Sequence, residues 1–204
     1  RNHSGLYHFA LLTPSRLALA RSLRRLVERR VSIGGGDHLV SEALYLSDPD
    51  GNGIEIYRDR PRETWTYAGG EIRMDTLPLD YRSILAELEG ELEDDGGEWA
   101  GLEPETTLGH MHLHVNDLQQ AYTFYHDIVG FDLMVNYGGS ALFFSAGGYH
   151  HHLGTNTWAG VGAPPTPPDA VGLRHYEVRL ANAEERARLA ARFDPSEQME
   201  RALR

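Results

Sequence analysis

Apolar and polar residues alternate in three short segments, each of which begins with a glycine and carries a histidine near its start. The segments cover residues 5–12, 109–115 and 172–178, and the histidines are His8, His110 and His175. Strict alternation predicts a half-buried β-strand. Its recurrence predicts one supersecondary unit that is used repeatedly along the chain.

The first segment is followed by a helical pattern and then by further strands. Pro14 and Ser15 are suited to start a helix that runs to about residue 29, because leucines and alanines recur on one face. Strands are predicted near 31–33, at 41–47 and at 53–57, and Gly34–Gly36 are taken to end the helical region. The last two strands are joined by Asp-Pro-Asp-Gly-Asn at 48–52, which favours a tight turn. This order predicts a βαβββ unit.

The second and third segments begin similar units. A helix is predicted over 118–129, with Asn116 or Asp117 as its N-cap and Gly130 as its end. Strands are predicted at 132–137, 141–145 and 149–156. After a proline-containing linker at 160–169, a strand at 173–180 and a helix at 183–192 follow. Between the first two units we predict a helix over 81–92 and read the acidic stretch 91–98 as a solvated face.

These elements predict an α+β fold of repeated βαβββ units that form curved mixed sheets. Residues 1–60 form the second unit of an N-terminal module, 61–105 a linker with a helix, and 106–204 a C-terminal module of one unit and a partial second. On this interpretation the first unit and the end of the last unit are missing from the chain.

Composition narrows the classes of function. The 204 residues include 41% hydrophobic and 24% charged residues, which is ordinary for a globular protein, and carry a formal net charge of −11. This charge argues against a nucleic-acid partner, and no apolar run approaches the roughly 18 residues that cross a membrane. Cysteine and lysine are absent, which excludes disulfides, thiolate ligands and Schiff-base chemistry and is compatible with a cytoplasmic location. Eleven histidines remain as the unusual feature.

His8 and Glu55 form the first candidate site, because the first and last strands of one curved unit would direct both side chains into its concave face. Two histidines and one carboxylate hold non-haem iron with open coordination positions, and this pair supplies two of the three. A buried histidine hydrogen-bonded to a carboxylate is the plainer alternative. His38 and Tyr45 flank the same strands and could exchange protons with a bound substrate, or be a loop histidine and a core tyrosine.

A second candidate site involves the later histidines. His110, His112 and His114 alternate and so face one side of a strand, and alternation likewise brings His150 and His152 together. With His175 they could form a second metal centre. A polar, water-filled cavity explains the same pattern equally well, since no carboxylate from a closing strand is present.

The chain resembles the vicinal-oxygen-chelate superfamily of glyoxalases, bleomycin-resistance proteins and extradiol dioxygenases, and within it the two-module catechol 2,3-dioxygenase-like group. The resemblance is carried by the sequences at 5–15, 37–45, 47–57, 108–118, 121–125, 130–131 and 145–158. It implies that His8 and Glu55 are the second and third metal ligands, and that Tyr45 and His38 contact substrate and handle protons. The first ligand then lies upstream of residue 1, unless the unit at 105–158 pairs with the unit at 1–58 and supplies His110.

For the other module, the resemblance implies a first ligand at His110 and a second at His175, with His152 near the fourth-strand ligand of glyoxalase-type members. The implied activity is ring-opening dioxygenation of a catechol-like aromatic by Fe(II) and O2, with Zn, Ni or Mn as other metals. A glyoxalase-type isomerase or lyase and a non-catalytic binding or resistance protein remain alternatives. Three ligands favour oxygen chemistry, and four, including His152, favour isomerisation. The expected partners are small molecules, with a homodimer left open.

Overall fold

The computed structural model describes residues 2–89 and 99–193 of the chain. It divides into two compact units, Tyr7–Met111 (the 7–111 unit) and Arg1–Leu6 together with His112–Arg204 (the 112–204 unit). The boundaries fall inside strands β1 (Gly5–Leu12) and β7 (Thr107–His114), so both strands have residues in each unit. The acidic stretch at 91–98 and the end of the helix predicted over 81–92 lie outside the described residues.

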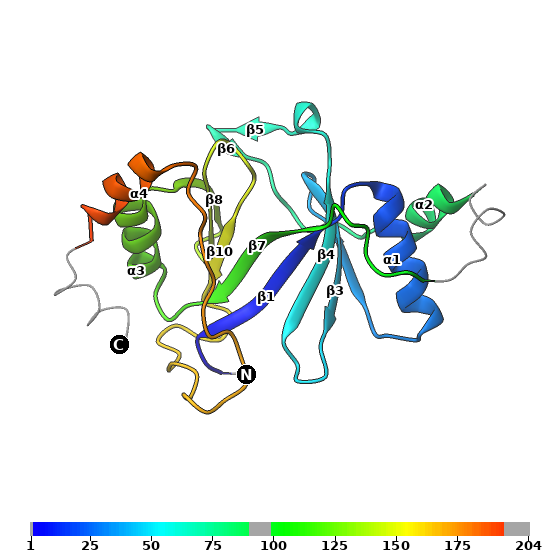
Figure 1. The fold of residues 1–204 in the computed structure, drawn as a ribbon, viewed down its shortest axis with the longest axis horizontal. Coiled ribbons are helices and arrows are strands. Elements are labelled where there is room, and N and C mark those ends of the chain that lie inside the picture. The colour runs from blue at the N-terminus through cyan, green and yellow to red at the C-terminus, as the bar shows by residue number, and fades with distance from the viewer. Residues whose placement is uncertain (1, 90–98, 194–204) are drawn as a thin grey trace. The chain divides into compact units, whose positions relative to one another are not determined.

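The 7–111 unit contains one βαβββ motif, and its strands form a mixed sheet with the order β2-β3-β4-β1-β7 (Figure 1). Strand β4 pairs with β1 in parallel and with β3 in antiparallel orientation, and β2 pairs antiparallel with β3. Its further elements are α1 (Arg16–Glu28), β2 (Gly34–Asp37), β3 (Ser41–Ser47) and β4 (Gly53–Asp59). The predicted first strand, helix and two later strands are therefore confirmed, to within two residues at their ends.

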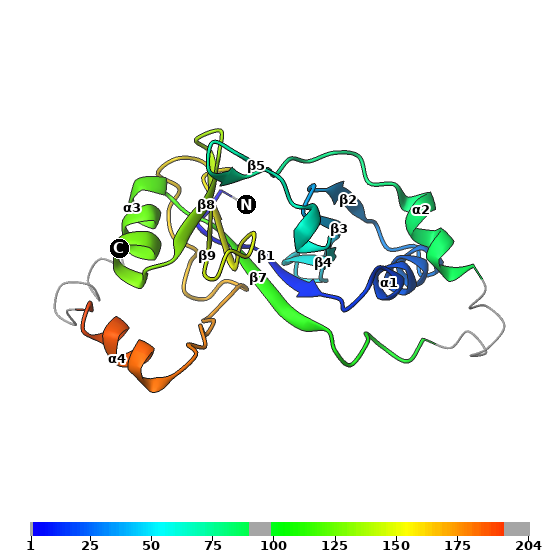
Figure 2. The same ribbon diagram turned by 90° about the horizontal axis from the view of Figure 1, so that it is seen from above.

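Helix α1 covers one face of this sheet (Figure 2). It begins at Arg16 because the Ser15 side chain caps it, accepting a hydrogen bond from the backbone N–H of Ala18 at 3.1 Å. The buried cluster on this side comprises Leu19, Ala20, Leu23, Leu44, Ile56, Leu79, Ile84 and Leu88. Because side chains alternate along a strand, the neighbours of Leu44 and Ile56 face the other side. There Ala43 and Tyr57 pack with Ala10.

The segment between β4 and β7 contains more structure than the sequence pattern predicts. It forms the short hairpin of β5 (Tyr67–Ala68) and β6 (Glu71–Ile72), which the pattern misses because each strand has only two residues. The predicted helix is present as α2 (Tyr81–Leu85) and continues as a 3₁₀ turn, η2 (Ala86–Leu88). A first 3₁₀ turn, η1 (Arg62–Thr64), follows β4.

The 112–204 unit contains the end of a second βαβββ unit, with the strand order β7-β10-β9-β8. Its elements are α3 (Leu118–Tyr122), the π-helix η3 (Thr123–Val129), β8 (Asp132–Tyr137), β9 (Ala141–Ser145), β10 (Leu153–Asn156) and α4 (Ala183–Ala190). Asp117 caps α3, and Gly130 ends the helical region with a φ of +90°, as the sequence predicts. The two βαβββ units confirm the predicted α+β fold class.

Three predicted strands are wrong in extent or existence. The strand expected near 31–33 lies instead at Gly34–Asp37, where glycines without side chains pair closely with β3. The strand expected over 149–156 begins only at Leu153, so residues 150–152 do not alternate between faces. No strand forms at 173–180, because this segment pairs with no strand among the described residues and lies mostly exposed. No described helix is both long and apolar enough to cross a bilayer.

Candidate metal centre

The face of the 7–111 sheet opposite α1 gathers polar side chains from four strands. His8 comes from β1, Tyr45 from β3, Glu55 from β4 and His110 from β7. Tyr45 and Glu55 are direct partners in the register of β3 and β4. Neighbouring strands therefore place residues that are distant in sequence side by side.

Two imidazoles converge on one carboxylate oxygen. Nε2 of His8 lies 2.9 Å from Oε2 of Glu55, and Nε2 of His110 lies 3.1 Å from the same oxygen. The three ligand atoms all lie within 4.8 Å of one another, and all three residues are buried. Two histidines and one carboxylate are the donor set that holds a divalent first-row metal while leaving coordination positions open. The chemistry of the donors therefore fits a divalent metal ion.

The carboxyl group of Glu55 is held in its charged form despite its burial. Burial by itself would raise its pKa, but the imidazoles of His110 and His8 outweigh this effect and hold the pKa well below its usual range. Only 2% of the Glu55 surface is exposed. A buried anion that is retained between two imidazoles has the charge that a cation requires.

Two glycines allow the strands to bring these side chains together. A Cβ atom on Gly53 would lie 2.2 Å from the carbonyl oxygen of Tyr7 and 2.9 Å from the Cβ of His8, its register partner. A Cβ atom on Gly109 would lie 2.0 Å from the hydroxyl oxygen of Tyr57, whose ring packs 4.9 Å from that of His110. A larger residue at position 53 would therefore collide with His8, and one at position 109 with the Tyr57 ring that packs against His110.

Tyr45 and His38 form a hydrogen-bonded pair beside the cluster. Nε2 of His38 lies 2.7 Å from the hydroxyl oxygen of Tyr45. The Tyr45 ring centroid lies 5.6 Å from that of His8. Burial first, and then the charge of Glu55, raises the pKa of Tyr45 well above its usual value, so the hydroxyl keeps its proton. Tyr45 is also the register partner of Glu55, so the pair lies directly beside the cluster.

The later histidines have different surroundings. The resemblance assigns His110 to the other module unless the two βαβββ units pair, and the structure has the second arrangement, in which His110 lies with His8 and Glu55. Nδ1 of His152 lies 3.0 Å from the Ser145 hydroxyl, and His175 is exposed. Within the described part of the 112–204 unit, no group of three or more histidines and acidic residues is close enough to hold a metal. His150 contacts the adjacent His151 (Nδ1 to Nδ1, 2.7 Å).

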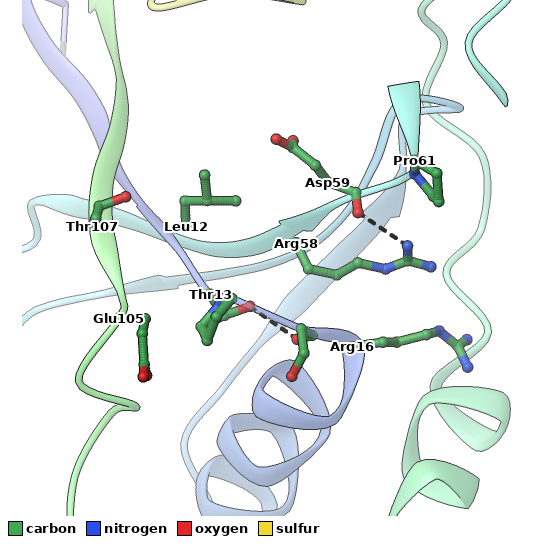
Figure 3. A pocket seen from close by; sticks show the side chains of 10 residues that line it. Leu12, Thr13, Arg16, Arg58, Asp59, Pro61, Glu105 and Thr107 are labelled. Carbon is green, nitrogen blue, oxygen red and sulfur yellow. Dashed lines mark hydrogen bonds between the residues drawn. The ribbon is translucent and has the colours of Figure 1, made fainter. Parts of the chain in front are cut away.

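A separate pocket of about 390 Å³ lies at the start of α1, and none of the three clustered residues lines it. Figure 3 shows the side chains of Arg16 and Arg58 extending beside it, with Asp59 and Glu105 on other parts of its wall. Both guanidinium groups already bind Glu42: Nε of Arg16 at 2.9 Å and Nε of Arg58 at 2.6 Å. The arginines therefore stabilise the fold here and do not offer free positive charge to a ligand.

Comparison with known proteins agrees with this picture. Residues 107–203 match the family model of the Glyoxalase/Bleomycin resistance protein/Dioxygenase superfamily. A relative from Bacillus subtilis (strain 168), named catechol-2,3-dioxygenase, is 54% identical over 188 residues, or 91% of this chain. The chain spans 64% of that relative's length.

Two solved structures resemble the chain distantly. A Bacillus subtilis (strain 168) protein with a provisional dioxygenase name has a TM-score of 0.46 and 15% identity, covering 75% of this chain and 40% of its own. A Mn(II)-bound glyoxalase from Novosphingobium aromaticivorans has a TM-score of 0.31 and 19% identity, covering 91% and 50%. The match of residues 107–203 to the family model and the 54% identical relative both relate the chain to the glyoxalase/bleomycin resistance/dioxygenase superfamily.

Proposed function

We propose that the chain forms the metal-binding part of an extradiol-type ring-cleaving dioxygenase that acts on a catechol-like aromatic compound. The observation that carries this proposal is the convergence of His8 and His110 on one oxygen of Glu55. The name of the 54% identical relative supports the reaction class. The substrate, O2 as co-substrate and any homodimer are parts of the proposal.

The proposed cofactor is Fe(II), held by Nε2 of His8, Nε2 of His110 and a carboxylate oxygen of Glu55. When bound, such an ion supplies Lewis-acid and redox chemistry to a diol and to oxygen. The described residues bring three ligand groups together. Three ligands favour oxygen chemistry over glyoxalase-type isomerisation, for which a fourth protein ligand is expected, so the dioxygenase is the function proposed.

The protein's own groups would orient the substrate and transfer protons. The Tyr45 hydroxyl, protonated and 2.7 Å from Nε2 of His38, is placed to donate a hydrogen bond toward a substrate oxygen or toward this imidazole. His38 would take up a proton at Nε2 as the substrate loses its hydroxyl proton. Burial of the three ligand residues keeps bulk water from competing at the centre.

The test is anaerobic loading of the purified chain with Fe(II), followed by metal analysis and oxygen uptake with catechol. Ring cleavage next to the diol consumes one O2 per catechol and leaves both oxygen atoms in the product, so the product mass rises by one O2. Glu55→Gln should lose both metal and oxygen uptake. Glu71→Gln, the same change at an exposed position on β6, should keep both.

Two results would contradict the proposal. A Glu55→Gln protein that retains stoichiometric metal places the centre elsewhere. A metal-loaded wild-type chain that consumes no oxygen with any of a panel of catechols, but isomerises a thiol adduct of an α-ketoaldehyde, would favour the glyoxalase class.

A further inference from the structure

We propose that the segment 75–77, after the β5–β6 hairpin, holds His38 in the tautomer that carries hydrogen on Nδ1. This tautomer leaves Nε2 as a hydrogen-bond acceptor that faces Tyr45. The segment belongs to none of the motifs that predict the site. A neutral histidine in water favours the opposite tautomer, with hydrogen on Nε2, so the proposed state has to be imposed by the protein.

The backbone of residues 75–77 is hydrogen-bonded to strand β2. The N–H of Leu77 donates to the carbonyl oxygen of Asp37, and the N–H of Asp37 donates to that of Leu77, both at 2.9 Å. This pairing places the carbonyl oxygen of Asp75 2.9 Å from Nδ1 of His38. A carbonyl oxygen can only accept a hydrogen bond, so Nδ1 has to donate. The Thr76 hydroxyl, which could act either way, is farther from Nδ1, at 3.4 Å.

The glycines of β2 make room for this arrangement. A Cβ atom on Gly36 would lie 3.0 Å from Cε1 and Nε2 of His38, and one on Gly35 would lie 2.7 Å from the Leu79 side chain. Gly34–Gly36 lack the lysine and the spacing of a phosphate-binding loop. Their contacts give them another role: they let the imidazole and the following segment lie directly on the strand.

The backbone of His38 is also fixed from the side of β3. Its N–H donates to the carbonyl oxygen of Ser41 at 2.9 Å. The Asp37 carboxylate accepts from the N–H of Leu39 at 3.0 Å and from Nη2 of Arg60 at 2.7 Å. Leu39 has a φ of +69°, an unusual conformation for a residue other than glycine. The turn is therefore held in one geometry, and the ring has a defined direction.

The consequence for chemistry depends on the proposed function, but the tautomer itself does not. With hydrogen on Nδ1, the lone pair of Nε2 points to the Tyr45 hydroxyl 2.7 Å away. A lone pair at this position is what uptake of a proton requires. Residues 75–77 would thus act as a positioning segment for His38 without touching substrate.

The tautomer can be read from the ¹⁵N resonances of the His38 ring in mildly alkaline solution. Spectra are recorded on the metal-free chain and on the Zn(II)-loaded chain, and His38→Gln identifies the signals. Leu77→Pro removes the N–H that donates to Asp37, and Gly36→Ala places a Cβ against the ring. Leu77→Ala and Gly34→Ala are the matched controls, since a Cβ on Gly34 meets only ordinary contact, 3.8 Å from that of Tyr45.

Wild type and both controls should show hydrogen on Nδ1, whereas Leu77→Pro and Gly36→Ala should shift the population toward Nε2. In the Fe(II)-loaded protein the two disruptive variants should lower kcat about 10-fold or more, with bound metal unchanged. Hydrogen on Nε2 in wild type overturns the inference, and so does an unchanged tautomer in both disruptive variants. If the tautomers behave as expected but wild type cleaves no catechol, the inference stands and the proposed function fails.

Discussion

In the 7–111 unit the imidazoles of His8 and His110 face a buried carboxylate, whereas in the 112–204 unit His112 and His114 face the carboxamide of Asn156. Nδ2 of Asn156 lies 3.0 Å from Nε2 of His112, and its Oδ1 lies 2.6 Å from Nδ1 of His114. An amide offers one donor and one acceptor side, so it can satisfy one histidine with each. A carboxylate offers only acceptors and a negative charge.

The comparison shows that histidines on a repeated strand motif do not by themselves define a metal site. His8, Glu55 and His110 are buried, as are His112 and Asn156, whereas His114 is half-buried. Both groups include two histidines around one oxygen-bearing side chain. The two central side chains differ in one atom of the terminal group: Glu55 has a second carboxylate oxygen where Asn156 has an amide nitrogen. The carboxamide of Asn156 hydrogen-bonds to both of its histidines. The Glu55 carboxylate carries a negative charge and therefore favours a cation between it and its two histidines.

The largest effect that we expect is on metal affinity, and it should distinguish two histidines that lie two residues apart on β7. His110→Asn removes one of the three proposed ligands, so metal affinity should fall by more than the roughly 10- to 100-fold cost of removing a residue that only orients a ligand. His112→Asn should keep the metal, because its imidazole contacts Asn156. Metal content after dialysis against a weak chelator measures both.

The control for His110→Asn is circular dichroism of the metal-free variant, which should match that of metal-free wild type. If His112→Asn loses as much metal as His110→Asn while remaining folded, the contrast between the two units is wrong.

The next effect concerns the charges of the 7–111 unit. Burial by itself would raise the pKa of Glu42, but hydrogen bonds and charge from Arg16 and Arg58 outweigh it, and the pKa is lowered. A carboxyl group whose pKa is lowered by folding stabilises the folded state at pH values above its unfolded-state pKa of about 4.3. This stabilisation is lost as the pH falls through the folded-state pKa. Glu42→Gln should therefore cost about 3 kcal/mol at pH 7, and the gap to wild type should narrow below about pH 4.

Denaturant unfolding at pH 7 and at pH 3 to 4 measures this difference. The matched control is Glu87→Gln, because Glu87 also binds Arg16 but is much more exposed. It should cost less than about 1 kcal/mol at either pH. A Glu42→Gln cost that is equal at both pH values would show that its charge does not matter.

Most of the fold could be predicted from local pattern, because the elements that matched carry clear signals. Ser15 and Asp117 cap their helices, and β3 and β8 coincide with their predicted ranges. The prediction failed where pairing rather than pattern decides. Gly34–Asp37 forms a strand because its backbone pairs with that of β3. The alternating segment at 173–180 has no partner among the described residues and forms none.

The candidate residues follow from the sequence, whereas their grouping stayed open between two alternatives. His8, Glu55, Tyr45 and His38 were identified from their positions on one unit, and the structure brings them together. The grouping of His110 with His8 and Glu55 was one of two alternatives, because it depends on β7 lying beside β1, which no local signal specifies. The positions of Asp75 and Asn156 were missed, because one acts through its backbone and the other is an ordinary strand residue.

A smaller effect should appear when the carboxamide of the 112–204 unit is made acidic. Asn156→Asp places a carboxylate beside His112 and His114, which reproduces the donor set of the other unit. We expect the variant to bind one additional Zn(II). At a free concentration ten times its Kd, that ion should stabilise the fold by about 1.4 kcal/mol.

Thermal unfolding of Asn156→Asp with and without Zn(II), beside wild type, measures this gain. Asn136→Asp, the same change at an exposed position on β8, is the control and should gain nothing. If Asn156→Asp binds no more zinc than wild type, a carboxylate is not the feature that distinguishes the two units.

The smallest effect concerns a neutral pair in the 112–204 unit, the hydroxyls of Tyr125 and Tyr176, which lie 3.0 Å apart. Burial, followed by the neighbouring Tyr176 hydroxyl, raises the pKa of Tyr125, so neither ring ionises near neutral pH. Tyr125→Phe should therefore cost about 1 kcal/mol, equally at pH 4 and pH 8. Tyr67→Phe, at an exposed ring, should cost almost nothing.

Denaturant unfolding at both pH values measures the two variants. A cost for Tyr125→Phe that changes with pH would mean that this pair is coupled to a charged group and is not the neutral contact described here.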